Sequence, residues 1–575
     1  MMAAFGRNEN RKKKQEEKKR KVQRVIRLKK CTGAAGRWNK TIGQIWADPD
    51  GSTVLREKRS AGERASSFIK VHRWELTFVF LMGCLLFGLS WILPFNEAPD
   101  EAMRYLIPQY IYRHGTLPKG WEEEVRNKLW GISYAFQPYI PYMIGGYLMK
   151  LVGLFTDSEH ALMMTARFVN IVIGMGFYWY VLQIGKKLFA SRLFRTFFVA
   201  LLAMLPQLLY IFTYVNTDGM AVFSSAMIIY YWLEGLEKKW NRQSCTGLAV
   251  AVAVCALSYF NAYGYALFSV FLFIGSMVVF YRRKGIKECG AMIVKRGLFI
   301  AVVVFLLAGW WFVRAAVLFD GDILGMKTSS KYGEMYAMDE YRPSERQSLQ
   351  EQGVELSTML KNGDEGGMDW FILTYRSVIG VFGYAKYIMG LDLYEIHKSL
   401  FLVGFVGILL HILLAAGYYL MAWAGSRTNS RTGGTGKLEK PRLTFENCRI
   451  CPVNFCILQV SLAFCMVIPV ILSIYYSYVS DFQPQGRYVM PMIVPLMYFT
   501  AAGMERFMTL FFRKWFVYPM MLLMFYAVLH VFLGAFVSLY IPTFVESLSS
   551  WADIRFPWFA NVDILTKLLQ AMLPG

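Results

Sequence analysis

Apolar residues in this chain occur in long blocks, which short polar or basic segments separate. A block of about 20 apolar residues can cross a bilayer as a helix, whereas helices and strands of soluble proteins show periods near 3.6 or 2 residues. The pattern therefore predicts an all-α polytopic membrane protein with about eleven transmembrane helices. The blocks lie at 74–94, 165–184, 194–213, 218–235, 246–260, 264–281, 297–318, 399–423, 454–478, 488–508 and 516–540.

One further apolar segment, 134–155, decides the orientation of everything that follows it. If it does not cross, basic connections such as "GKKLFASRLFR" and "YRRKGIKE" share the side of the basic N-terminus, and "YVNTD", "FNAY" and "FQPQGR" share the other. Lys and Arg of short loops are enriched on the cytoplasmic side. Pro138 and Pro141 also interrupt the segment. We therefore expect 134–155 to be an interfacial or re-entrant juxtamembrane segment on the outer face, and the N-terminus to be cytoplasmic.

This orientation divides the chain into three parts. Residues 1–73 form a basic cytoplasmic tail, residues 74–540 a membrane domain, and residues 541–575 an extracytoplasmic segment. Two long connections of the membrane domain, 95–164 and 319–398, are expected on the outer side of the membrane. Their length favours a functional role over that of a plain linker. A multi-pass protein of the plasma membrane, with any chemistry on the outer face, follows from this division.

Composition agrees with a membrane protein, since 55% of the 575 residues are hydrophobic and the formal net charge is +22. The basic tail can attract anionic lipid or serve only as a solvated topology signal. A charge run alone does not indicate a nucleic-acid partner. We expect the pair Cys448 and Cys451, with Cys456 nearby, to be incidental, because a zinc site needs a second ligand pair. The chain has no Walker loop, which disfavours an ATP-driven pump.

Candidate chemistry begins with "PDEAMRY", directly after the first span. Pro99 is expected to open a helix, with Asp100 and Glu101 in its first turn. A carboxylate that loses water at a membrane boundary has a raised pKa, and such a group can act as a general base towards a hydroxyl. The alternative is an ordinary ion pair of Asp100 with Arg104, four residues later.

Polar residues also occur at three other outer ends, where spanning does not require them. Asn216 and Asp218 lie between the third and fourth spans, and Arg314 ends the seventh, where it can pair with nearby aspartates. Gln485, Arg487 and Tyr488 begin the tenth span. Arg487 is the only basic residue of its short loop and could hold a phosphate with its planar fork, although snorkelling to headgroups is the alternative.

Several of these motifs together resemble the GT-C glycosyltransferases, which include protein O-mannosyltransferases and the enzymes that add aminoarabinose to lipid A. The resemblance rests on the acid pair in the first outer loop, on Gln137-Pro138-Tyr139, and on Arg167 in "TARFVN" at the start of the next span. "NTDG", "GWWFVR" and "QGRY" resemble a bacterial branch of predicted GT-C membrane proteins. The chain departs from the pattern where Tyr139 replaces a second proline and where Ala315 follows Arg314.

The resemblance implies transfer of a sugar from a polyprenyl-phosphate donor to a glycan, lipid or protein acceptor of the cell envelope, with inversion. Asp100 and Glu101 would be catalytic, as base or as ligands of a divalent metal, and no separate metal site is predicted. Arg487 and Arg167 would bind the donor phosphate. Substrate-binding residues would be Gln137, Asn216, Asp218, Gln485 and Tyr488. The alternatives are a transporter or flippase of the lipid-linked sugar, and a membrane scaffold that recruits partners through the basic tail.

Overall fold

The computed structural model describes residues 61–361, 369–428 and 450–543. Most of the predicted tail, most of the C-terminal segment and Cys448 lie outside the described residues. In the described part, eight helices are long and apolar enough to cross a membrane, which confirms a polytopic helical membrane protein. They are α3 (Arg73–Ile92), α6 (Glu159–Leu188), α9 (Asp218–Glu237), α11 (Tyr263–Tyr281), α12 (Ile286–Leu318), α16 (Leu391–Thr428), α17 (Pro452–Val479) and α20 (Lys514–Ala535).

The other three predicted spans are also helical, but they are short or interrupted. Pro206 divides one of them, and Pro491 lies in a 3-10 turn that precedes the helix of another, because proline has no backbone N–H to donate. These spans correspond to α7 (Arg192–Ala203) with α8 (Pro206–Ile211), to α10 (Arg242–Ala256), and to α18 (Gly486–Val489) and η6 (Met490–Met492) leading into α19 (Ile493–Phe511).

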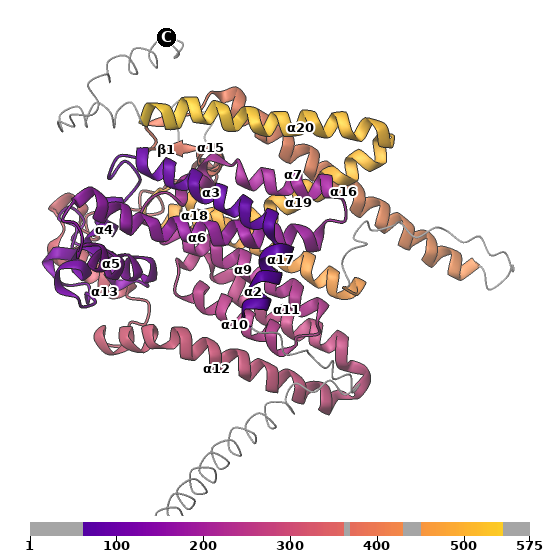
Figure 1. The fold of residues 1–575 in the computed structure, drawn as a ribbon, viewed down its shortest axis with the longest axis horizontal. Coiled ribbons are helices and arrows are strands. Elements are labelled where there is room, and N and C mark those ends of the chain that lie inside the picture. Colours follow the sequence, from indigo (N-terminus) through magenta and orange to yellow (C-terminus); the bar gives the residue numbers. More distant parts are fainter. Residues whose placement is uncertain (1–60, 362–368, 429–449, 544–575) are drawn as a thin grey trace, which may run out of the picture.

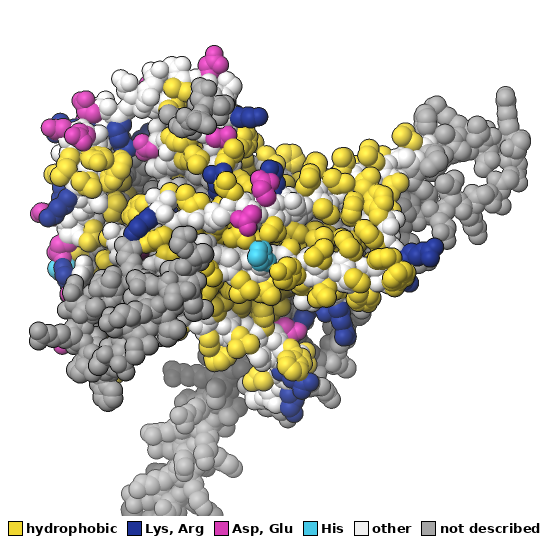
Figure 2. Space-filling model, turned by 90° about the horizontal axis from the view of Figure 1, so that it is seen from above, with side chains coloured by type: hydrophobic (Ala, Val, Ile, Leu, Met, Phe, Trp, Pro, Cys, Tyr) yellow, Lys and Arg dark blue, Asp and Glu magenta, His cyan; other side chains and the backbone are white. Residues whose placement is uncertain are grey.

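Helix α9 lies at the centre of the bundle, where it packs against α6, α10 and α11. In its most apolar window 83% of the residues are buried, against 11% for α12, which lies along one side of the molecule in Figure 1. α16 packs along α19, and α11 along α17. On the face shown in Figure 2, hydrophobic side chains cover most of the described surface between the two ends of the bundle. This surface is the one that lipid would contact.

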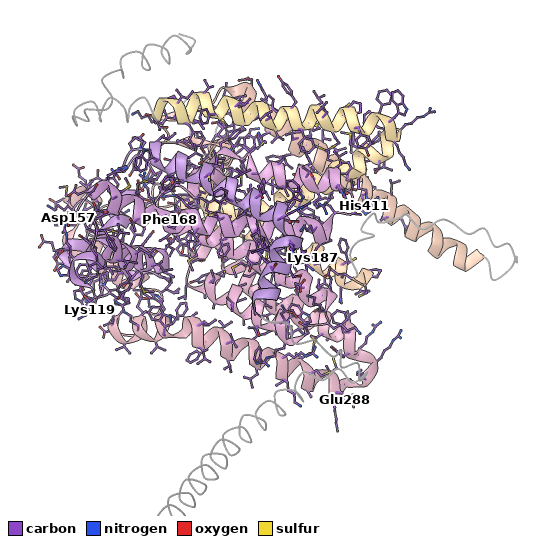
Figure 3. The ribbon with its side chains drawn as sticks, viewed as in Figure 1. Lys119, Asp157, Phe168, Lys187, Glu288 and His411 are labelled. Carbon is purple, nitrogen blue, oxygen red and sulfur yellow. The ribbon has the colours of Figure 1, made fainter. Side chains whose placement is uncertain are left out.

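One end of the bundle carries the two long connections, and we call it the loop end. Helices α4 (Glu101–His114), α5 (Ile140–Val152) and α13 (Met326–Tyr336) gather there (Figure 1). Lys119 and Asp157 lie at this end, whereas Lys187 and Glu288 lie towards the other (Figure 3). Helix α5 has 13 residues and a length of about 20 Å, too short for a hydrocarbon core of about 30 Å. α10, with 15 residues, is also shorter than this core, so the juxtamembrane placement of 134–155 stays a prediction.

The remaining described elements are short. Two strands of two residues each, β1 (Val381–Phe382) and β2 (Tyr387–Ile388), pair antiparallel as a small hairpin, and the other elements are helices or single turns. They are α2 (Ala61–Val71), η1 (Glu123–Val125), η2 (Tyr134–Phe136), η3 (Phe260–Ala262), η4 (Arg282–Lys284), η5 (Asp339–Tyr341), α14 (Leu356–Leu360), α15 (Trp370–Ile379) and η7 (Phe536–Tyr540).

Candidate active site at the loop end

Asp100 directly precedes α4 and adopts a left-handed backbone conformation, with φ 64° and ψ 11°. Its backbone N–H donates to the hydroxyl of Tyr384 at 3.1 Å. The helix therefore begins at Glu101, two residues after Pro99, which was expected to open it. A left-handed non-glycine residue costs on the order of 1–3 kcal/mol and persists where its surroundings hold it, often at functional sites.

A chain of alternating charges runs from Asp218 through Arg104 and Asp100 to Arg487. Arg487 Nη2 donates to Oδ2 of Asp100 at 2.7 Å, and Arg104 Nη1 donates to Oδ2 of Asp218 at 3.0 Å. Arg104 Nη2 lies 3.6 Å from Asp100, so the expected ion pair exists, but it is the longer of the two contacts of Arg104. The side chain of Asp100 is 24% exposed, against 5% or less for the other three. Asp100 is therefore the member that a substrate can reach.

The pKa of Asp100 is shifted in the direction opposite to the expected one. Burial acts to raise it, but the positive charges of Arg487 and Arg104 and the hydrogen bond from Arg487 outweigh burial and hold the pKa below its usual value. The expected rise considered loss of water and repulsion from Glu101. That expectation did not include the combined positive charge of the Arg487 and Arg104 guanidinium groups at one carboxylate. Asp100 is therefore ionised at neutral pH.

Glu101 and Arg167 form a separate, fully buried pair. Arg167 Nε and Nη2 donate to the two carboxylate oxygens of Glu101 at 2.7 and 2.6 Å. Its remaining N–H groups donate to the backbone carbonyls of Ser90, Leu93 and Pro94, so the five donors of the guanidinium are all used. Glu101 also accepts from the backbone N–H groups of Asn96 and Val215. The pair joins the end of α3, the start of α4, α6 and the turn before α9.

We predict that Arg167→Ala destabilises the protein by about 3–5 kcal/mol, because it leaves the buried Glu101 carboxylate without its counter-charge. Thermal unfolding in detergent, followed by size-exclusion chromatography of heated samples, measures the effect. The matched control is Lys398→Ala, which removes an ion pair with Glu395 whose side chains are both 63% exposed. Equal unfolding temperatures for the two variants would contradict a structural role for the buried pair.

The residues next to Asp218 and Arg487 in the chain make close contacts with backbone groups, and these contacts position the two charged side chains. The Asn216 side chain donates to the carbonyls of Ile211 and Tyr214 and accepts from the N–H of Gly219, so it shapes the turn that begins α9. Gly486 approaches α15 so closely that a Cβ would lie 2.3 Å from its backbone. The N–H of Gly486 donates to Ser377 Oγ at 2.8 Å. These contacts place the two charged side chains within the same cluster.

A cavity of about 280 Å³ is lined by Tyr488, the residue after Arg487, although neither Arg487 nor Asp100 is itself a lining residue. The hydroxyl of Tyr488 accepts a hydrogen bond from Arg487 Nη2 at 2.9 Å. Gln137, from the connection 95–164, is also a lining residue. Gln485, the residue before α18, is not among the lining residues. The cavity thus brings together two of the expected substrate-binding residues, Gln137 and Tyr488, beside the charge chain that contains a third, Asp218.

Asn261 and Ser473 also line this cavity, and neither was among the expected site residues. Both side chains are at least nine-tenths buried, and Asn261 Oδ1 and Ser473 Oγ have no hydrogen-bond partner among the described residues. Buried polar atoms are usually satisfied, so these two indicate a place for a polar ligand or water. Ser473 and Ser477, four residues apart on one face of α17, with Ser480 directly after the helix, were the signal that could have located it.

A second, apolar cavity of about 690 Å³ lies between α10, α11 and α12. Ala256 and Ala266, at its end nearest the loops, are each five residues from Asn261. The Asn261 side chain donates to the backbone carbonyl of Tyr488 at 2.9 Å. The apolar cavity and the polar cavity share no lining residue, but Asn261 of the polar cavity follows α10 and precedes α11, the helices that line the apolar one.

The site does not fit a divalent metal. No group of three or more His, Cys, Asp or Glu that could hold an ion occurs in the part of the chain that the structure describes. Asp100 faces two guanidinium groups, where a metal would need further oxygen ligands.

Arg314 lies outside the charge cluster. It donates to the carbonyl of Pro118 at 2.6 Å, in place of the expected pairing with an aspartate.

Comparison with known proteins found no family model that matches the chain and no matching curated protein. Among solved structures, the chain is similar to the archaeal oligosaccharyltransferase AglB from Archaeoglobus fulgidus in complex with an inhibitory peptide and a dolichol-phosphate. The identity is 13% and the TM-score 0.43, over 84% of this chain and 56% of that chain. It is also similar to ArnT from Cupriavidus metallidurans bound to undecaprenyl phosphate, with 13% identity and a TM-score of 0.42, over 84% of this chain and 80% of that one. The chain thus spans little more than half the length of the archaeal structure.

Proposed function

We propose that this protein is an integral-membrane glycosyltransferase of the plasma membrane. It transfers a sugar from a polyprenyl-phosphate donor to a hydroxyl of a cell-envelope acceptor at the loop end, which faces outward, and inverts the anomeric carbon. The observation that carries the proposal is the contact between Asp100 and Arg487, whose neighbour Tyr488 lines a polar cavity. The apolar cavity between α10, α11 and α12 supports it. The motif resemblance supplies the reaction class, and the contacts supply the residues.

Arg487 is the residue that we assign to the donor phosphate. Its Nε has no partner among the described residues, so the guanidinium retains a donor for a ligand. The leaving polyprenyl phosphate gains negative charge as its bond to the sugar breaks. A fixed guanidinium that is 5% exposed stabilises this charge more strongly than water-exposed arginine would. Arg167, whose donors are all used, is assigned to structure and not to the phosphate.

The two cavities accommodate the two halves of such a donor. The apolar cavity along α10, α11 and α12 is suited to an isoprenoid chain, and the polar cavity to the sugar. In the polar cavity, Gln137, Asn261 and Ser473 provide an amide, a carbonyl oxygen and a hydroxyl for sugar hydroxyls. Because Tyr488 lines this cavity and contacts Arg487, a phosphate at Arg487 would lie beside the sugar.

Asp100 is assigned as the general base. The acceptor oxygen forms a bond to the anomeric carbon, the bond from that carbon to the phosphate oxygen breaks, and the hydroxyl proton moves to Asp100. In the free enzyme Arg487 holds Asp100 as a weak base. A donor phosphate competes for Arg487 and adds its own negative charge, so donor binding raises the pKa of Asp100. Arg104, held by Asp218, keeps the carboxylate in place meanwhile.

The proposal predicts that purified protein releases undecaprenyl phosphate from a panel of undecaprenyl-phosphate monosaccharides labelled in the sugar. The label is expected to appear in acceptors extracted from the cell envelope. Thin-layer chromatography of the lipid phase and counting of the acceptor phase measure the two products. If proteoliposomes instead move the intact lipid-linked sugar across the bilayer and release no undecaprenyl phosphate, the protein is a flippase and the proposal is wrong.

A further inference from the structure

A third cavity, of about 370 Å³, lies at the loop end next to the polar cavity beside Arg487. The two cavities share Gln137, Met326, Ser480 and Asp481 among their lining residues. We infer that this third cavity is the acceptor subsite and that the acceptor it binds is a saccharide approaching from water. This inference rests on the proposed function of the neighbouring site, and it adds the chemical class of the second substrate.

The lining of the third cavity suits a polyhydroxylated ligand. Hydroxyl groups of Ser329, Ser330 and Ser348 surround it, together with the amide of Gln137. Sugar hydroxyls both donate and accept hydrogen bonds, and serine hydroxyls and the glutamine amide can do the same. Its lining residues come from the two long connections and from the end of α17 and the loop after it. A lipid-anchored acceptor would instead need an apolar opening towards the bilayer.

An ion pair between Arg346 and Asp481 provides a fixed polar group at the boundary between the two cavities. Arg346 Nη1 donates to both carboxylate oxygens of Asp481, at 3.1 and 3.0 Å. The guanidinium also lies over the ring of Trp130, 4.9 Å from its centre. Arg346 Nε has no hydrogen-bond partner in the described part of the chain. The pair is thus held from two sides and retains donor capacity for a ligand.

The turn η2 connects this cavity to the reacting groups. Gln137, which directly follows η2, lines both cavities, and Tyr134 at the start of η2 lies under the guanidinium of Arg104 at 5.1 Å. Gly325, before α13, allows the start of that helix, whose Met326 lines both cavities, to lie against this turn, because it has φ 68° and a Cβ there would lie 2.2 Å from the carbonyl oxygen of Phe136. A saccharide in the third cavity would therefore present a hydroxyl towards the cavity beside Arg487.

The test combines direct binding with steady-state kinetics. Soluble oligosaccharides of two to four sugars, prepared from the envelope glycan, are the probe, and saturation-transfer NMR with full-length protein in detergent reports their binding. We expect Ser330→Trp, which fills the cavity, to abolish this binding. Arg346→Gln is expected to raise the KM for the oligosaccharide roughly 10- to 100-fold, because it removes hydrogen bonds from a charged donor. Little change in kcat is expected. The matched controls are Ser357→Trp and Arg342→Gln, which lie outside the cavity lining.

The outcomes separate this inference from the proposed function. If wild-type protein cleaves no donor, the proposed function fails, and NMR binding of the oligosaccharides still reports on the cavity. If donor is cleaved but Ser330→Trp binds and uses oligosaccharides as wild type does, the cavity is not the acceptor subsite. If only lipid-anchored acceptors are glycosylated, while soluble oligosaccharides neither bind nor react, the assignment of a water-borne saccharide is wrong.

Discussion

Replacing Asp100 by asparagine is expected to lower kcat for sugar transfer by about 10²- to 10⁴-fold, the contribution of a positioned general base. Asparagine has nearly the same shape, and its carbonyl oxygen can still accept from Arg487, but it cannot take the proton of the acceptor hydroxyl. The measurement is release of undecaprenyl phosphate from the labelled donor with saturating acceptor. Thermal unfolding of the variant verifies that the protein remains folded.

The control for this variant is Asp157→Asn, which changes an exposed aspartate of the same long connection (Figure 3). We expect this control to turn over as the wild-type protein does. If Asp100→Asn also transferred sugar at the wild-type rate, Asp100 would have no role in proton transfer. Asp100 would then only position Arg487.

The pH dependence of wild-type turnover tests the same assignment. Asp100 must be ionised to act, and in the free enzyme Arg487 and Arg104 hold its pKa below the usual value of an aspartate. The acid limb of kcat/KM for the donor, which reports the free enzyme, is therefore expected at low pH. In the donor complex the phosphate takes Arg487 and raises the pKa, so the acid limb of kcat lies at higher pH. Coincident limbs would contradict competition for Arg487.

The predictions of the spans, of a juxtamembrane segment and of roles for Asp100 and Arg487 all rested on local patterns. Runs of apolar residues and the distribution of lysine and arginine depend only on neighbours along the chain, and both long connections lie at one end as expected. Asp100 and Arg487 are 387 residues apart, yet each stood out because a charge was unnecessary where it occurred. The contact between them was not predicted, because no local pattern relates residues so far apart in the chain.

The partners within the charge cluster could not be predicted, because several pairings satisfy the same composition. Arg104 was expected as a simple partner of Asp100, and only the three-dimensional structure shows its shorter contact with Asp218 at the start of α9. Arg167 was expected to bind the donor phosphate, whereas in the fold three backbone carbonyls and Glu101 accept from all of its N–H donors. The expected direction of the pKa shift of Asp100 was reversed because the guanidinium of Arg487, from a distant segment, joins that of the nearby Arg104 at one carboxylate.

Replacing Arg487 by alanine is expected to lower kcat by about 10²- to 10³-fold, the effect of losing one fixed group that stabilises developing negative charge. Arg487→Lys should recover only part of the rate, because the ammonium keeps the charge but not the planar fork. The assay is again undecaprenyl phosphate release, and Arg113→Ala, which removes an arginine of α4 that is 56% exposed, is the matched control.

The alanine variant also carries a signature that a folding defect would not produce. Arg487 is the stronger of the two charges that lower the pKa of Asp100, so its loss raises that pKa. The acid limb of kcat/KM for the donor should therefore move to higher pH in Arg487→Ala, and in Arg113→Ala it should stay where the wild-type protein has it. A variant that loses rate but keeps the wild-type pH profile would show that Arg487 and Asp100 do not act on one another during turnover, and the site as assigned would have to be divided.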